Sequence, residues 1–315
     1  MHKALIALVP GLVLAGALAS GCTVTTSSSA ADGGTADGSS SADGGASGDG
    51  GGCGVGEPND TREQATAITL GSKYEGLCMT PKGTDSDVDF YEFTAPNDAA
   101  GGYVTFSMTN VGAGSLEYKV YAAADNGEIT SAYTTTNGQS VSGYFTVAPG
   151  QKYRLALDNF AGAPAEYKYD LELKYTKLND TFEPNNTKDA AKDITVGTPV
   201  NGFFGGGYRG QELKDEDIDD WFAVDVTAGK VKVNLTDTSD VSAEVTLFSP
   251  TGEQIETKYS TTPGADINLV SPEPVAAGKY RIRVNQFSGK PKCAGNGDTL
   301  PQHLTKAYKL TVTVE

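Results

Sequence analysis

Two copies of one short signature, E-P-N-D-T at residues 57–61 and E-P-N-N-T at residues 183–187, decide the fold. Each is followed by an acidic run that enters an aromatic segment, D-S-D-V-D-F-Y at 85–91 and D-E-D-I-D-D-W at 215–221. Each unit therefore joins an acidic, amide-rich segment to an acidic loop. We expect oxygen-bearing side chains from the two parts to converge, which would suit a cation.

The spacing of the signatures indicates an internal duplication. The same offset of 126 residues relates Ala65 to Ala191 and Ile68 to Ile194, and later strand-like segments correspond again after extra residues in the second copy. A register kept over many positions predicts two domains of one architecture. We place the first domain at residues 53–176 and the second at residues 177–315.

Alternating apolar residues predict antiparallel β-structure in both copies. The clearest alternating runs are Val104, Phe106 and Met108; Tyr153, Leu155 and Leu157; Val231, Val233 and Leu235; Tyr280, Ile282 and Val284; and Tyr308, Leu310 and Val312. Helix is expected only for about two turns after each signature, where Asp60 with Glu63, and Asn186 with Asp189, have capping-box spacing. The fold class is therefore all-β, as two tandem antiparallel, jelly-roll-like β-sandwiches.

The N-terminus is typical of an exported lipoprotein. A basic start precedes an apolar run, and small residues lead to Cys22, so residues 1–21 form a signal peptide. L-A-S-G-C at residues 18–22 resembles the lipobox of bacterial lipoproteins, which implies fatty acylation, such as palmitate, at Cys22. The alternative is ordinary secretory cleavage. Several acyl chains would anchor the protein to a membrane without crossing it.

Residues 22–52 form a tether between this anchor and the folded part. They are almost entirely Ser, Thr, Ala, Gly and Asp, so they offer no apolar surface to offset the entropy of ordering. We expect a flexible linker that holds the domains away from lipid. Thr23 is consistent with sorting to the outer membrane of the cell envelope, while the periplasmic or surface face stays open.

Charge and composition exclude several functions. The chain has 40 acidic and 24 basic residues and a net charge of -16, which disfavours nucleic acid as a partner. It has two histidines, one of them in the leader, and neither a Gly-x-Ser-x-Gly elbow nor a His-Glu-x-x-His motif. We therefore predict that the protein is not an enzyme. The alternative is a glycoside hydrolase that uses a carboxylate pair.

The repeated unit resembles the bacterial pre-peptidase C-terminal family, a β-sandwich module of secreted peptidases and surface proteins. Its Glu-Pro-Asn signature, its acidic loop before an aromatic strand, its Gly-Lys-Tyr-Arg turn and its closing Tyr-x-Leu strand carry the resemblance. Because the family includes calcium-stabilised modules of collagenases, the resemblance implies Ca²⁺ ligands in both copies. They are Glu57, Asn59, Asp60, Asp87 and Asp89 in the first, and Glu183, Asn185, Asn186, Asp217 and Asp219 in the second.

The second copy departs from this pattern. Matching Trp221 to Phe90 aligns Asp220 with Asp89 and leaves Ile218 opposite Asp87. We therefore expect the second copy to bind calcium more weakly or not at all. The alternative for both copies is that Asp60 and Asn186 are helix N-caps beside solvated acidic loops, without a metal.

Three cysteines remain beyond Cys22. In an exported protein, Cys53 and Cys78 could pair and fasten the entry segment of the first domain. This pairing leaves Cys293 without a partner in the sequence. Cys293 is then a free thiol or a link to another chain, or the proposed pairing is wrong.

Together these features predict a non-catalytic protein, lipid-anchored through Cys22, whose calcium-stabilised sandwiches bind an extracellular polymer, such as a polysaccharide, or a protein. The alternative is a structural spacer, or a component of an envelope complex, with no soluble ligand. An exposed aromatic patch would favour the binding function over the spacer.

Overall fold

The computed structural model describes residues 56–79, 87–160, 166–204, 219–289, 293–294 and 299–315. The predicted signal peptide, the lipidation site Cys22, the tether, Cys53 and Asp217 lie outside these residues. In the described part of the chain, no helix is long and apolar enough to cross a membrane.

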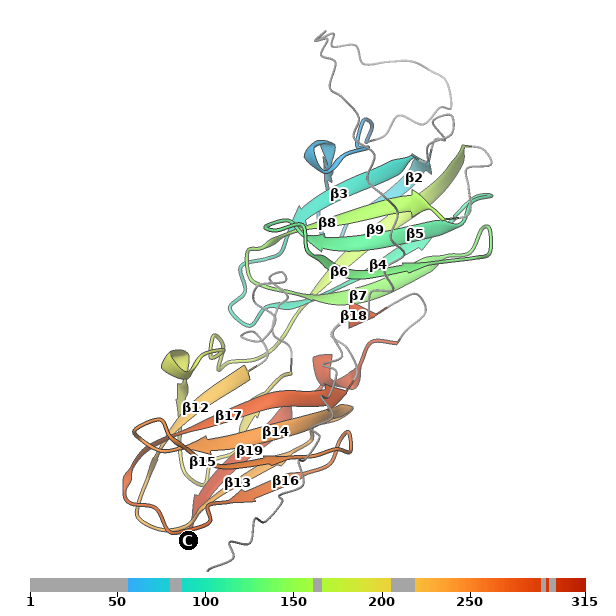
Figure 1. Cartoon of the computed structure of the whole chain (residues 1–315). Coiled ribbons are helices and arrows are strands. Elements are labelled where there is room, and N and C mark those ends of the chain that lie inside the picture. Colours follow the sequence, from blue (N-terminus) through green and yellow to red (C-terminus); the bar gives the residue numbers. More distant parts are fainter. Residues whose placement is uncertain (1–55, 80–86, 161–165, 205–218, 290–292, 295–298) are drawn as a thin grey trace, which may run out of the picture.

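The first sandwich is built from two facing sheets (Figure 1). One has the strand order β1-β3-β8-β5-β6 and the other the order β18-β7-β4-β9-β2. Its strands are β1 (Thr66–Ala67), β2 (Lys73–Met79), β3 (Val88–Thr94), β4 (Gly102–Thr109), β5 (Leu116–Ala122), β6 (Glu128–Tyr133), β7 (Val141–Val147), β8 (Lys152–Asn159) and β9 (Tyr167–Lys177).

The second sandwich repeats this plan with the strand orders β10-β12-β17-β14-β15 and β11-β19-β13-β16. Its strands are β10 (Lys192–Ile194), β11 (Val200–Gly202), β12 (Asp219–Val226), β13 (Val231–Thr236), β14 (Val241–Phe248), β15 (Gln254–Tyr259), β16 (Ile267–Val270), β17 (Gly278–Gly289) and β19 (Tyr308–Val314). In both sandwiches the first strand pairs in parallel with the acidic-loop strand, and all other strand pairs are antiparallel.

The alternating residues form two separate cores, as the sequence predicts. Val104, Phe106, Met108, Tyr153 and Leu155 are buried between the first pair of sheets. Val231, Val233, Leu235, Ile282 and Tyr308 are among the residues buried between the second pair. Because successive side chains of a strand point to opposite faces, alternate positions supply each core. The all-β, tandem-sandwich prediction is confirmed.

The helices are shorter than predicted. In place of two helical turns, each signature is followed by a single 3-10 turn, η1 (Arg62–Gln64) and η2 (Lys188–Ala190). The N-caps are Thr61 and Thr187, one residue later than the predicted Asp60 and Asn186. The capping prediction was therefore wrong. A short polar segment has no apolar face to bury, and parallel pairing in β1 and β10 begins directly after it.

The two sandwiches contact each other through a loop of the second. The short strand β18 (Cys293–Ala294) pairs with β7 of the first sandwich, so that Cys293 lies opposite Phe145 (Figure 1). A third apolar cluster joins Tyr103 and Tyr144 of the first sandwich to Leu304, which belongs to the 3-10 turn η4 (Gln302–Leu304) of the second. The interface thus combines backbone pairing with a small apolar core.

Candidate metal centre

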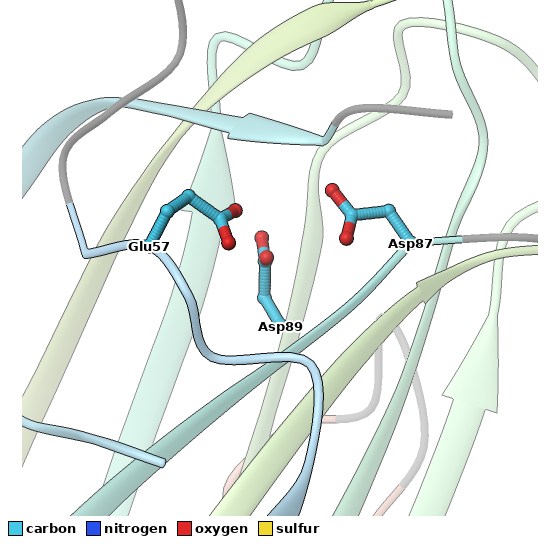
Figure 2. Close-up of side chains that lie close together, drawn as sticks. All are labelled: Glu57, Asp87 and Asp89. Carbon is cyan, nitrogen blue, oxygen red and sulfur yellow. The ribbon is translucent and has the colours of Figure 1, made fainter. Parts of the chain in front are cut away.

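Three carboxylates converge at one edge of the first sandwich. Glu57 comes from the segment before η1, Asp87 lies just before β3, and Asp89 lies within β3. The carboxylates of Glu57 and Asp87 point toward that of Asp89 from opposite sides (Figure 2). One ligand oxygen of each residue lies within 4.8 Å of the others. Residues two apart on an extended strand point the same way, which is why Asp87 and Asp89 share this site.

The signature amide completes this cluster. Asn59 is buried, and its backbone carbonyl accepts the N–H of Phe90 at 2.9 Å, which fixes the signature against β3. Its side-chain amide donates a hydrogen bond to the hydroxyl of Tyr91. Among the described residues, no donor reaches the buried Oδ1 atoms of Asn59 and Asp89. Buried oxygens without a donor are costly, so these two atoms point to a further positive partner.

The pKa of Asp89 also indicates that the cluster needs a positive partner. Burial raises the pKa of Asp89 to about 8, and the carboxylates of Asp87, Glu57 and Asp60 act in the same direction, against the hydrogen bond from Tyr169. The cluster therefore disfavours its own ionised form. A divalent cation would reverse this cost by pairing with the carboxylates.

The donor set fits Ca²⁺. This ion takes about 6–8 oxygen ligands at about 2.3–2.6 Å, so ligands on opposite sides of it lie about 5 Å apart. The three carboxylates and the amide oxygen of Asn59 supply hard oxygen donors at this scale. Of the five residues predicted for this site, Glu57, Asp87 and Asp89 are brought together, with Asn59 and Asp60 beside them.

The second copy assembles a different group. Asn185 is fully buried, its backbone carbonyl accepts the N–H of Trp221 at 2.9 Å, and its own backbone N–H donates to Glu183. The carboxylate facing Asn185 is that of Asp220, not of the predicted Asp219. Asp219 instead lies 3.8 Å from Arg283.

The predicted ligand set of the second copy therefore needs correction. Alternation along β12 sends Asp219 and Asp220 to opposite faces of the sheet, so only Asp220 faces the signature. Asn186 is half-buried, and Asp217 lies outside the described residues. Within the described ranges, the only group of three or more clustered metal-ligating side chains is Glu57, Asp87 and Asp89.

Two buried tyrosines were missed as members of these clusters. Tyr169 donates a hydrogen bond to Asp89, and Tyr308 donates to Asp220 at the corresponding place. The hydroxyls of Tyr91 and Tyr169 also contact each other at 2.6 Å. The signal available in the sequence is the closing Tyr-x-Leu strand of each copy, which carries the family resemblance but does not by itself place the tyrosine hydroxyl at the acidic cluster.

Cys78 is disulfide-bonded. The backbone position of Cys293 excludes it as the partner, because β2 and β18 are the opposite edges of a five-stranded sheet. Four strand spacings of about 4.8 Å separate them, whereas bonded cysteines have Cα atoms less than about 7 Å apart. The pairing with Cys53 stays a prediction.

Each sandwich also carries a stacked pair of exposed aromatic rings. Tyr133, at the end of β6, stacks on Phe160 with ring centroids 3.7 Å apart, and Tyr259, at the end of β15, stacks on Phe287 at 4.5 Å. The four side chains are between 41% and 53% exposed. Tyr133 pairs with Glu117 and Tyr259 with Glu244, so the two tyrosines occupy corresponding places on the edge strands β6 and β15. Phe160 directly follows β8 and Phe287 lies in β17, which are internal strands.

Comparisons with known proteins give likenesses of fold. No known protein family and no curated protein matches the sequence. The pre-peptidase C-terminal domain of a collagenase from Bacillus anthracis is 22% identical, covers 37% of this chain and 100% of its own, and has a TM-score of 0.27. Tripeptidyl peptidase 2 is 10% identical over 80% of this chain and 24% of its own, with a TM-score of 0.30.

The CUB1-EGF-CUB2 segment of human MASP-1/3 is 9% identical over 77% of this chain and 99% of its own, with a TM-score of 0.23.

Proposed function

We propose that this protein is a non-catalytic, lipid-anchored component of a bacterial cell envelope. Its first sandwich is stabilised by Ca²⁺, and its two sandwiches bind an extracellular polymer. The carboxylates of Glu57, Asp87 and Asp89 hold the ion, with the amide oxygen of Asn59, and thereby fix the signature segment against β3. In this proposal the ion is structural, because its ligands join the signature segment to β3.

The observation that carries the binding function is the duplicated aromatic pair. Exposed aromatic side chains are costly in water and gather where a partner covers them. Tyr133 with Phe160, and Tyr259 with Phe287, stack at corresponding positions although the surrounding sequences differ. Two equal surfaces on one chain would add avidity on a repetitive ligand.

The charges near the pairs favour an uncharged polymer with flat apolar faces, such as a neutral polysaccharide. Glu117 is 3.3 Å from Lys119, and Glu244 is 2.8 Å from Arg283, so the acidic groups paired with Tyr133 and Tyr259 are themselves neutralised. The net charge of -16 repels polyanions at longer range. With these charges neutralised, the aromatic rings are the principal surface for contact with the polymer.

Co-sedimentation tests this function. The full chain is incubated with insoluble cellulose, chitin, peptidoglycan and fibrous collagen, beside Tyr133→Ser, Tyr259→Ser and the double variant. We expect one of the glycans to retain the chain, about tenfold less retention for each single variant, and none for the double variant. Val270→Ser is the control, because Val270 is 40% exposed on the other sheet of the second sandwich. Equal retention of all variants would contradict the proposal.

The membrane anchor is supported by the signal-peptide pattern and the lipobox-like residues before Cys22. Metabolic labelling with a fatty acid provides the readout. The wild-type chain should take up label and partition into detergent, and Cys22→Ser should do neither. Export of an unlabelled wild-type chain would instead support ordinary secretory cleavage.

One observation favours a second function, that of a rigid spacer. The pairing of β18 with β7 and the apolar cluster around Leu304 connect the two sandwiches, which suits a protein that holds another at a fixed distance. Failure of every polymer to retain the wild-type chain would favour this alternative.

A further inference from the structure

The two signature asparagines have different partners although their backbones are held alike. In both copies the asparagine carbonyl accepts an N–H from the acidic-loop strand at 2.9 Å. The two copies differ in the residue of the acidic-loop strand that pairs with the first strand of the sandwich. Thr66 of β1 lies opposite Tyr91, whereas Lys192 of β10 lies opposite Phe222. Tyr91 and Phe222 therefore occupy the same place, and only the first carries a hydroxyl.

In the first copy, that hydroxyl orients the amide. The side-chain nitrogen of Asn59 donates to Tyr91, and Tyr91 is held in turn by the hydroxyl of Tyr169. With the nitrogen engaged, the amide oxygen of Asn59 is left without a donor in the described structure. The oxygen is the end of the amide that can bind a cation.

In the second copy, the side-chain amide of Asn185 faces two carboxylates. Phe222 offers no acceptor. Of the two orientations of this amide, the one that satisfies its hydrogen bonds turns the nitrogen toward the carboxylates, 3.2 Å from Asp220 Oδ1 and 3.3 Å from Glu183 Oε2. Both distances are those of hydrogen bonds. One NH₂ group thus bridges two carboxylates that would otherwise repel each other.

We propose that the residue at this position determines how each sandwich neutralises its acidic cluster. Tyr91 turns the Asn59 oxygen toward a bound Ca²⁺, whereas Phe222 lets the Asn185 nitrogen take the place of the ion. The inference rests on the proposed calcium site of the first sandwich. It adds that Tyr91 is a positioning residue and that the second sandwich is stable without metal, so the chain binds one Ca²⁺.

The charges of the two clusters agree with this division. The first combines Glu57, Asp60, Asp87 and Asp89, which is more negative charge than one amide can balance. In the second, asparagine stands at 186 in place of Asp60, and isoleucine stands at 218, two residues before Asp220. Among the described residues, the Asn185 amide faces the carboxylates of Glu183 and Asp220, and its NH₂ group has two hydrogens to donate.

Calorimetric titration of the full chain in detergent, stripped with chelator and titrated with CaCl₂, tests the inference. We expect one site in the wild-type chain and an affinity about tenfold weaker in Tyr91→Phe, the scale of one lost hydrogen bond. Tyr153→Phe is the matched control, because it removes the hydroxyl of another tyrosine of the same core, one that accepts the N–H of Ala148 and not an amide of the signature. Its calcium affinity should equal that of the wild-type chain.

The second sandwich is tested with Asn185→Asp. Without calcium, this variant should melt several degrees lower, because a third carboxylate replaces the bridging amide, and added CaCl₂ should restore part of the loss. Two sites in the wild-type chain, unchanged affinity in Tyr91→Phe, or an Asn185→Asp variant as stable as wild type in chelator would each overturn the inference. A wild-type chain that binds no calcium would overturn the proposed metal site itself.

Discussion

Asp89 and Asp220 show how one position can serve two electrostatic designs. Both are buried, and each accepts a hydrogen bond from the tyrosine of the closing strand. Asp89 lies among other carboxylates, which contribute to its raised pKa, whereas Asp220 faces the amide of Asn185. The duplicated backbone is therefore compatible with a metal-binding cluster and with a metal-free one. We propose that the neighbouring side chains determine which of the two forms.

Asp170 provides a residue-scale prediction about pH. It accepts hydrogen bonds from the N–H of Gly76 at 3.0 Å and from Asn110, and it pairs with Lys73. The bond from Gly76, with Lys73 and Asn110, lowers the pKa of Asp170. A lowered pKa stabilises the folded state above the ordinary aspartate pKa of about 3.9, and this contribution is lost as pH falls through the lower, folded-state value.

Urea unfolding at pH 7 and at about pH 2.5 measures this effect. Asp170→Asn should cost about 1 kcal/mol of unfolding free energy at pH 7, and its deficit should shrink at the acidic pH. Asp193→Asn is the control, because Asp193 and Lys279 form an exposed pair of the kind that contributes little. A deficit for Asp170→Asn that grows on acidification would be inconsistent with the sign of this pKa shift.

At the scale of elements, the predictable strands are those with one buried face. Phe106 in β4 and Ile282 in β17 lie within long runs in which alternation fixes both the strand and its inward residues. Local irregularities are not encoded in such a pattern. A bulge between Tyr74 and Leu77 adds one residue to β2. Beyond the bulge, Leu77 lies opposite Tyr169 of the closing strand, which is the place that Gly202 has opposite Tyr308 in the second sandwich. The constant offset between the copies ends at this bulge.

The candidate site was predictable in part, from the signatures and from the alternation of side chains along the strands. The signatures identified Glu57, Asp87 and Asp89 through the family resemblance, and alternation already separated Asp219 from Asp220. We propose that Tyr91 and Phe222 decide which way the amides of Asn59 and Asn185 point. The hydrogen bond between Asn59 and Tyr91 forms only after the signature docks on the strand, so the sequence pattern does not show it. The aromatic pairs escaped prediction because stacking joins residues of different strands.

The short turn η4 yields a prediction about one element. Asp240 accepts the backbone N–H groups of Gln302 and His303 and lies 2.8 Å from Nδ1 of the buried His303. Asp240→Asn should lower the free energy of unfolding by about 2 kcal/mol, because the NH₂ group of the new side chain would face an N–H donor of Gln302 or His303. Hydrogen exchange should accelerate at residues 302–305. Asp237→Asn, which alters an exposed group near Lys306 and Lys309, should leave exchange there unchanged. Unaltered exchange in Asp240→Asn would disprove the anchoring role.

For the whole molecule, the contact between the sandwiches predicts coupled unfolding. Leu304 is 1% exposed and packs with Tyr103, Tyr144 and Leu178 in the cluster that joins the domains. Leu304→Ala should remove about 2–4 kcal/mol through a cavity at this interface. In scanning calorimetry, the wild-type chain should then show one transition, and Leu304→Ala two. Val270→Ala, on an exposed face of the second sandwich, should keep the wild-type profile. Two transitions in the wild-type chain would mean that the domains unfold independently.

The central claim is that the acidic cluster of the first sandwich holds calcium, and thermal melting of the full chain in chelator and in increasing CaCl₂ tests it most directly. At a concentration about 100 times Kd, binding adds about 2.7 kcal/mol, so the wild-type midpoint should rise by roughly 5 °C or more. Asp89→Asn should abolish the rise, whereas Asp220→Asn, its counterpart in the second sandwich, should retain it. A wild-type midpoint that does not move with calcium would contradict the account.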